Sequence, residues 1–195
     1  ICVDGPSRIT QVALSLDSSI APVKITSIDI ECLGRMSGGK EFFPNANLPE
    51  CHIITISIIS KRHLHETYDK HIICLKETSS WPGTTVDWVE REEDLLINFR
   101  RYMIALNRDV DTGWNCINFD WPYIFARIEY YLNKHTEFQE EKSEYYLREL
   151  DKCMYLGRTR MKSVCKQDEM GSVQTGRRKV YQLIHQSVIP MDGML

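Results

Sequence analysis

The sequence predicts an α/β domain with a mixed β-sheet flanked by helices. Three observations lead to this prediction: β-branched strand-like segments come first, helical apolar patterns follow them, and a further strand candidate lies between two helical segments. The chain has 195 residues, of which 43% are hydrophobic and 26% charged, which is typical of one folded domain rather than a disordered or fibrous chain.

The first half of the chain predicts three strands. Residues 23–31 are rich in β-branched side chains, residues 52–60 form a second run of this kind, and residues 70–75 form a third. A Gly-rich turn at 34–39 and a Pro/Asn-rich loop at 44–49 separate the first two. Because three strands follow one another with short connections, we expect them to form an antiparallel meander.

The second half predicts helices. Residues 90–106 begin with acidic side chains, which suit a helix N-terminus, and continue with apolar residues at helical spacing. Residues 110–116 are a short strand candidate, and Pro122 suits the first turn of the next helix. Further along we expect a charged helix at 136–154, a basic loop region at 157–179 and strand-like alternation at 180–195. Among several α/β folds, this order matches the ribonuclease H-like arrangement, in which acidic residues gather at one end of the sheet.

Composition excludes several classes of function. The 24 Lys and Arg residues against 27 Asp and Glu residues give a net charge of −3, which excludes a strongly basic nucleic-acid coat but not a local basic site. The apolar stretches are too short to span a bilayer, no signal peptide precedes them, and we expect no membrane partner. The seven cysteines contain no Cys-x-x-Cys pair, which favours free, mostly buried thiols in a reducing compartment.

Asp29 and Glu31 are the first candidate site residues. They lie two positions apart on a predicted strand, so their side chains share one face, while Ile28 and Ile30 can be buried on the other. Adjacent carboxylates repel each other, and a divalent cation offsets that cost, so the pair is compatible with a Mg²⁺ or Mn²⁺ site. The alternative is a solvated strand face.

The stretch 112–123 supplies a third acid, Asp120. It follows a strand and a polar turn and stands just before Pro122, which places it at the carboxyl end of a strand, where α/β domains tend to build sites. The alternative makes Asp120 a helix cap and the neighbouring aromatic residues ordinary core. Together with the first pair, it makes a two-metal hydrolytic site a competitive interpretation.

Two further clusters carry weaker signals. One contains His63, His65, Glu66 and His71 without nearby cysteines, and we favour a solvated loop over a zinc site. In the other, the cationic run 177–179 suits either contacts to DNA phosphates or a solvated hairpin.

Four segments in this order resemble motifs of family B DNA polymerases. Residues 21–35, with the run Ser-Ile-Asp-Ile-Glu-Cys, resemble the first exonuclease motif of that family, and most closely that of delta-type catalytic subunits and of polymerases of large DNA viruses. The matching segments further along are 92–96, then 112–123 as the second exonuclease motif, and finally 174–178 with 190–195.

The resemblance implies a 3′-5′ exonuclease domain over residues 21–195, preceded over residues 1–20 by the tail of an N-terminal domain or a linker. It implies proofreading by two Mg²⁺ or Mn²⁺ ions, with Asp29 bridging both, Glu31 ligating one and positioning the attacking water, and Asp120 holding the second. Candidates for contacts to the DNA are Phe119, Trp114, Asn118, Arg177 and Arg178, although plain core packing suits Phe119 and Trp114 equally well.

The resemblance also implies partners: the primer 3′ end as single-stranded DNA, the other polymerase domains, accessory subunits and a sliding clamp, in the nucleus or at a viral replication site. The third motif of the family, a Tyr-x-x-x-Asp, does not occur in the sequence, and Asp192 matches a structural position instead. We therefore expect a fragment cut at both ends that is inactive alone both as a nuclease and as a polymerase.

Two other classes of function remain open. One is a non-catalytic ribonuclease H-like module that binds single-stranded DNA or a protein. The other is a stand-alone exonuclease of the same fold, which the delta-like residues around 21–35 and 174–195 disfavour.

Overall fold

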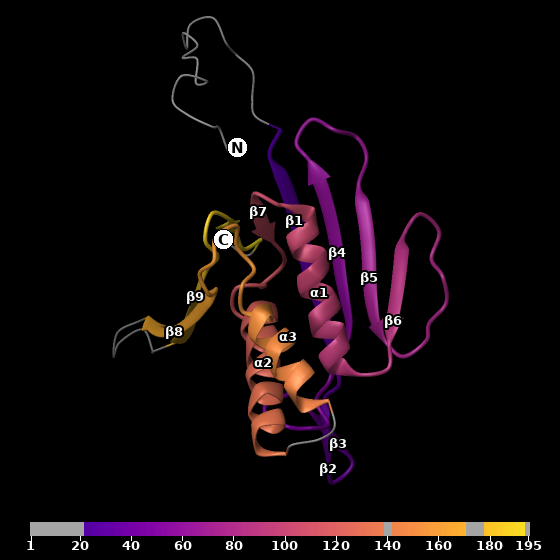
Figure 1. Cartoon of the computed structure of the whole chain (residues 1–195), viewed down its shortest axis with the longest axis vertical. Helices are drawn as coiled ribbons and strands as arrows, with labels where there is room; N and C mark the ends of the chain where they lie inside the picture. Colours follow the sequence, from indigo (N-terminus) through magenta and orange to yellow (C-terminus); the bar gives the residue numbers. More distant parts are fainter. Residues whose placement is uncertain (1–21, 139–141, 171–177, 194–195) are drawn as a thin grey trace, which may run out of the picture.

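The computed structural model describes residues 22–138, 142–170 and 178–193, so the predicted tail at residues 1–20 lies outside the described part. Figure 1 shows the elements along the chain. They are, in order, β1 (Lys24–Cys32), β2 (Arg35–Ser37), β3 (Lys40–Phe42), β4 (Ile53–Arg62), β5 (Asp69–Leu75), β6 (Thr85–Val89), α1 (Glu92–Leu106), β7 (Val110–Thr112), α2 (Asp120–Glu137), α3 (Ser143–Cys153), β8 (Val164–Met170), β9 (Arg178–Ile184) and β10 (Ile189–Pro190).

Six strands form one mixed sheet in the order β10-β7-β1-β4-β5-β6. β4 pairs antiparallel with both β1 and β5, which confirms the predicted meander, and the pairs β1–β7, β7–β10 and β5–β6 are parallel. Only β4 therefore runs against the other five strands, whose carboxyl ends lie at one edge of the sheet. The arrangement confirms the ribonuclease H-like fold.

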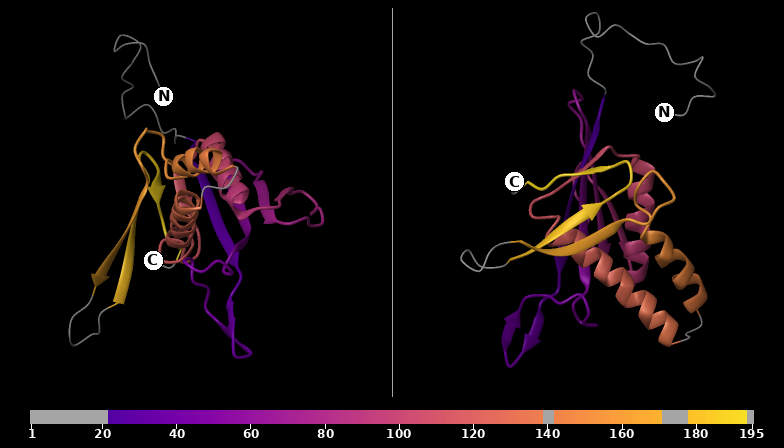
Figure 2. Two further views of the ribbon diagram at one scale, coloured as in Figure 1. Left: turned by 60° about the horizontal axis from the view of Figure 1, so that its bottom comes forward. Right: turned by 90° about the vertical axis from the view of Figure 1, so that its left-hand side faces the viewer.

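The three helices lie on the same side of the sheet (Figures 1 and 2). The connection through α1 leads from the β5–β6 side to β7, and the connection through α2 and α3 leads on towards β10. Because both crossovers move in the same direction across the sheet, connections of the same hand place their helices on one face. Ile28 and Ile30 of β1 point to this face and are buried, while Asp29 and Glu31 are exposed.

Two sequence predictions are wrong, and both concern polar segments. The charged stretch at 136–154 is not one helix, because α2 continues to Glu137 and α3 begins at Ser143. The expected basic loop at 157–179 contains β8, which pairs with β9 in a two-stranded ribbon (Figure 2). Most described side chains of β8 are exposed, so this strand has no apolar alternation from which it could be recognised.

A buried ion pair joins α1, α2 and the segment before β4. The Glu92 carboxylate accepts hydrogen bonds from Arg127 Nε (2.9 Å) and Nη2 (2.6 Å) and from the Ile53 amide (2.9 Å). Arg127 Nη1 also donates to the carbonyl oxygens of Ala46 and Leu48, at 2.8 Å each. Burial alone would raise the pKa of Glu92, but the hydrogen bonds and charge of Arg127 outweigh it and hold that pKa below its ordinary value.

The six cysteines within the described residues are all free, and four of them are buried, as the spacing predicted. No described helix is long and apolar enough to cross a membrane.

Replacing Arg127 with Met should destabilise the fold strongly, because it leaves the Glu92 carboxylate buried without its cation. We expect the free energy of unfolding in urea to fall by about 3–5 kcal/mol. The exposed Arg148→Met on α3 is the matched control, and we expect it to cost about 0–1 kcal/mol. Equal losses in the two variants would contradict the structural role of the pair.

Candidate functional site

Asp29 and Glu31 lie on β1, close to the edge of the sheet where the five parallel strands end. Both carboxylates are exposed, on the face of the sheet away from the helices. A register shift in the β1–β4 ladder falls between Glu31 and Cys32, immediately after the second acid. Bulges of this kind re-aim side chains next to functional sites.

Asp120 reaches the backbone between these two acids. Its Oδ1 accepts a hydrogen bond of 2.9 Å from the Ile30 amide. β7 pairs only with residues Ile25 to Ser27 of β1, so this amide lies beyond the end of its neighbouring strand and has no partner in that ladder. The carboxylate of Asp120 satisfies this buried donor, and it thereby comes to the same edge of the sheet as the first two acids.

The turn after β7 brings Asp120 there because it passes very close to β1. A Cβ atom at Gly113 would lie 2.6 Å from the carbonyl oxygen of Ile28, a distance that real Cβ atoms do not adopt. Only glycine fits this position, so the missing side chain of Gly113 permits the close approach. Asp120 is the first residue of α2 and not its N-cap, which is Phe119, so the cap interpretation is wrong.

Asp192, which follows β10, also binds this turn. Its Oδ2 accepts a hydrogen bond of 3.1 Å from the Ile117 amide, and the Gly193 amide donates to the Gly113 carbonyl at 2.8 Å. Asp192 is buried, with 8% of its surface exposed. It therefore positions the turn that carries Asp120.

Burial raises the pKa of the Asp120 carboxyl to about 6, from an ordinary value of 3.8. The negative charges of Asp29 and Asp192 raise it further, and the hydrogen bond from the Ile30 amide opposes the rise. The charge of Asp29 on β1 thus acts on the carboxyl of Asp120 on α2. Perturbed carboxyl groups of this kind are typical of functional sites.

The predicted DNA contacts lie in different surroundings. Trp114 is 70% exposed, on the turn before Asp120. Asn118 is exposed too, and its Oδ1 accepts a hydrogen bond from the Tyr181 amide of β9 at 3.3 Å. Arg177 lies outside the described residues, and Arg178 is the first residue of β9.

Phe119 is partly buried and packs between two other rings, with centroid distances of 5.3 Å to Phe43 and 5.6 Å to Tyr123. Sequence reasoning missed Phe43, which is 78% exposed and stands beside Phe119. The doublet of Phe42 and Phe43 before a proline, close after the paired acids, was the available signal.

The atoms at this edge that could ligate a metal ion are carboxylate oxygens, the ligand type that Mg²⁺ and Mn²⁺ prefer. Within the described ranges no three His, Cys, Asp or Glu side chains converge closely enough to hold a metal ion. Of the histidine cluster, His63, His65 and Glu66 are exposed between β4 and β5, but His71 is buried on β5 beside Asp87, so the solvated-loop interpretation is wrong for His71. The carboxylates fit a divalent cation by their chemistry, and their side chains would have to turn towards it.

The sheet order, the crossover helices and the acidic edge together define a ribonuclease H-like domain of the nuclease type. Residues 8–176 match the family described as DNA polymerase family B, exonuclease domain. Because this match covers most of the chain, the chain belongs to the exonuclease-domain family of family B DNA polymerases.

Curated relatives agree with this assignment. The chain is 42% identical over 119 residues to the DNA polymerase delta catalytic subunit of Dictyostelium discoideum, which covers 60% of this chain and 10% of the relative. It is 27% identical over 176 residues to that of Drosophila melanogaster, covering 90% of this chain and 14% of the relative. It is 35% identical over 113 residues to a DNA polymerase of Acanthamoeba polyphaga mimivirus, covering 57% of this chain and 6% of the relative. The chain thus spans only a small part of these relatives.

Replacing Asp120 with Asn should stabilise the fold at neutral pH. The pKa of Asp120 in the folded state, about 6, lies above its unfolded value, so ionisation above pH 6 opposes folding, and the effect disappears below about pH 4. Asn retains an acceptor for the Ile30 amide. We expect the free energy of unfolding to rise by about 1–2 kcal/mol at pH 7.5 and to match the unmodified chain at pH 4.

Asp109→Asn is the control of opposite sign. The hydrogen bond from the Lys24 amide and the charge of Arg158 hold the pKa of Asp109 below its ordinary value. This variant should therefore lose stability at pH 7.5, and the loss should shrink as the pH falls below about 4. If Asp120→Asn is instead less stable than the unmodified chain at pH 7.5, the ionised carboxylate of Asp120 does not oppose folding.

Proposed function

We propose that this chain carries the 3′-5′ exonuclease site of a replicative family B DNA polymerase, which removes mismatched nucleotides from the primer 3′ end by two-metal hydrolysis of the phosphodiester. The observation that supports the proposal is the hydrogen bond that the Ile30 amide donates to the Asp120 carboxylate, because this amide lies between Asp29 and Glu31 along β1. The proposal also rests on the family assignment.

Asp29, Glu31 and Asp120 would hold the Mg²⁺ or Mn²⁺ ions, with Asp29 shared between them. Bound ions of this type lower the pKa of a coordinated water and offset the charge that develops on the phosphate oxygens. Asp120 can serve as a ligand only when it has lost its proton, and its pKa of about 6 makes the site sensitive to mild acid. Glu31 lies on the exposed face, where it can orient the attacking water.

Aromatic side chains beside the acids would hold the frayed primer end. Phe43 and Trp114 are exposed and offer ring faces on which unpaired bases can stack without regard to sequence. Phe119 would then support Phe43 from within the fold. Asn118 and the run Arg177 and Arg178 would contact the DNA backbone near the β8–β9 ribbon.

The proposal extends to the larger enzyme, since the chain covers between 6% and 14% of the three relatives compared. It includes single-stranded DNA at the primer 3′ end, the other polymerase domains, accessory subunits and a sliding clamp as partners. It also includes a nuclear location or a viral replication site.

A second candidate is a non-catalytic ribonuclease H-like module that binds single-stranded DNA or a protein. One observation favours it: within the described residues the acids do not converge into a metal-binding group. Metal binding separates the two candidates.

Titration of the chain with Mn²⁺ should show saturable binding at pH 7.5 that weakens below pH 6, because protons compete for Asp120. Isothermal titration calorimetry measures the affinity, and paramagnetic broadening of the Ile30 amide signal locates the ion. Asp29→Asn/Glu31→Gln should abolish binding, whereas the matched double variant Asp69→Asn/Glu66→Gln should retain it. Absence of binding by the unmodified chain would favour the non-catalytic module.

The purified chain should show little or no hydrolysis of single-stranded DNA in Mg²⁺, because the resemblance assigns a further carboxylate to a Tyr-x-x-x-Asp motif that these 195 residues do not contain. Release of nucleotides from a 3′-labelled oligonucleotide measures the activity. Substantial hydrolysis that Asp29→Ala abolishes would show that the three acids suffice.

A further inference from the structure

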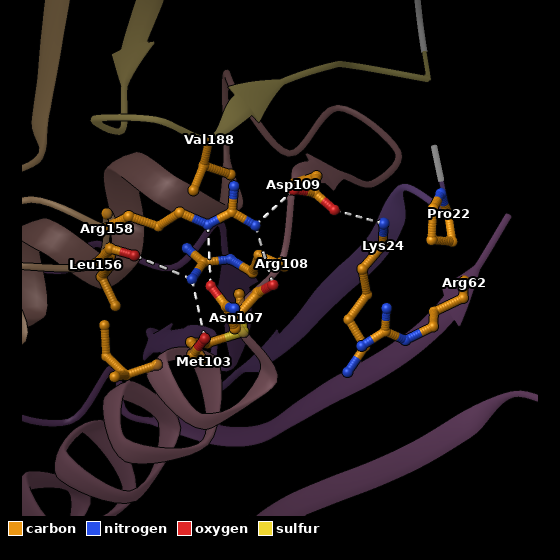
Figure 3. A pocket seen from close by; sticks show the side chains of 12 residues that line it. Pro22, Lys24, Arg62, Met103, Asn107, Arg108, Asp109, Leu156, Arg158 and Val188 are labelled. Carbon is orange, nitrogen blue, oxygen red and sulfur yellow. Dashed lines mark hydrogen bonds and ion pairs between the residues drawn. The ribbon is translucent and has the colours of Figure 1, made fainter. Parts of the chain in front are cut away.

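A second polar site lies at the opposite edge of the sheet, where β1 and β7 begin and β4 ends. It is a pocket of about 720 Å³ that opens to solvent (Figure 3). Its walls come from the start of β1, the end of β4, the segment between α1 and β7, and the loop before β8. A volume of this size is typical of a small-molecule site.

The pocket carries an excess of positive charge. Four cations line it, Lys24, Arg62, Arg108 and Arg158, against one carboxylate, Asp109. The buried carboxylate of Asp111 neutralises the charge of Arg108, because it accepts hydrogen bonds from both Nε and Nη2 of that arginine. The remaining three cations face a single acid, which leaves a net charge of about +2.

Two of these cations bind carbonyl oxygens at the end of α1, a helix that has no basic residue in its last turn. Lys24 Nζ donates to the carbonyl oxygen of Leu106 at 3.1 Å, and Arg158 Nη2 donates to that of Asn107 at 3.1 Å. These bonds satisfy carbonyl groups that a helix C-terminus leaves without partners. They also fix the two cations at the pocket wall, so their charge is held in place.

Arg62 has no such structural role. Within the described residues its guanidinium forms neither a hydrogen bond nor an ion pair, although its charge acts on Asp109. Figure 3 shows Arg62 beside Lys24 on one side of the pocket, with Arg108 and Arg158 on the other. Two like charges side by side favour an anion.

We propose that this pocket binds a phosphate-bearing ligand of the size of a mononucleotide. The phosphate would lie among Lys24, Arg62 and Arg158, and the less polar part against the side chains of Met103, Ile104 and Val188 that line the same pocket. The four cations line one pocket, which suits one phosphate group better than the backbone of a DNA strand.

Titration calorimetry on the purified chain in EDTA tests the proposal, with deoxyadenosine monophosphate, inorganic phosphate and deoxyadenosine as probes. We expect saturable binding of the monophosphate with a dissociation constant of about 0.1–1 mM, weaker binding of phosphate and none of deoxyadenosine. Arg62→Gln should weaken binding about tenfold, and Arg62→Glu should abolish it. Because Arg62 is exposed and holds no other described group, neither variant should change the melting temperature appreciably.

Arg160→Gln is the matched control, because Arg160 is exposed on the loop beside Arg158 but does not line the pocket, and it should bind as the unmodified chain does. Asp29→Asn/Glu31→Gln should also bind normally, which separates this site from the proposed exonuclease site. Two results would overturn the proposal: unchanged affinity in Arg62→Gln, or equal competition by an oligonucleotide that lacks terminal phosphates, which would identify the DNA backbone as the ligand.

Discussion

The hydrogen bond between the Ile30 amide and the Asp120 carboxylate is the constraint on which the site depends. β7 is short, so β1 runs past it and leaves a buried amide without a partner in the sheet. An unsatisfied buried amide would cost about 1–3 kcal/mol, and a carboxylate from the next helix supplies the acceptor. The fold thus needs a hydrogen-bond acceptor at the position where the proposed metal site would need an acid. Burial of the same carboxyl raises its pKa to about 6, and the hydrogen bond from the Ile30 amide opposes that rise.

Two buried ion pairs hold the elements that carry this constraint. Glu92 and Arg127 tie α1 to α2, the helix that Asp120 begins, and Arg108 and Asp111 tie the end of α1 to β7. Arg108 Nη1 also donates to the carbonyl oxygens of Met103 and Leu156, at 3.0 Å each. Apolar side chains of similar size could stabilise the fold as well as such pairs do. A guanidinium group, in contrast, binds several acceptors in one fixed geometry. Because these acceptors belong to different elements, each arginine fixes the orientation of its helix relative to the sheet.

The central strands followed from the sequence, because alternation in β1 and the apolar runs of β4 and β5 are local patterns. The motif around Asp120 was recognisable too, but its contact with Ile30 joins residues ninety positions apart, and no local pattern encodes it. The missing side chain of Gly113 lets the turn after β7 pass close to β1. The strand β8 was not predicted, because most described side chains of the ribbon are exposed to solvent. It is defined by its pairing with β9 and not by burial.

Charge is divided between the two edges of the sheet. Asp29, Glu31 and Asp120 lie where the parallel strands end, and Lys24 and Arg62 lie where β1 begins and β4 ends. Lys24 and Asp29 are five positions apart on β1, which is about 16 Å in a strand. This is twice the Debye length of about 8 Å at physiological ionic strength, so the charges at one edge act only weakly on those at the other. Two strands join the two edges directly: β1 carries both Lys24 and the paired acids, and β7 leads from Asp109 at the pocket to the turn before Asp120.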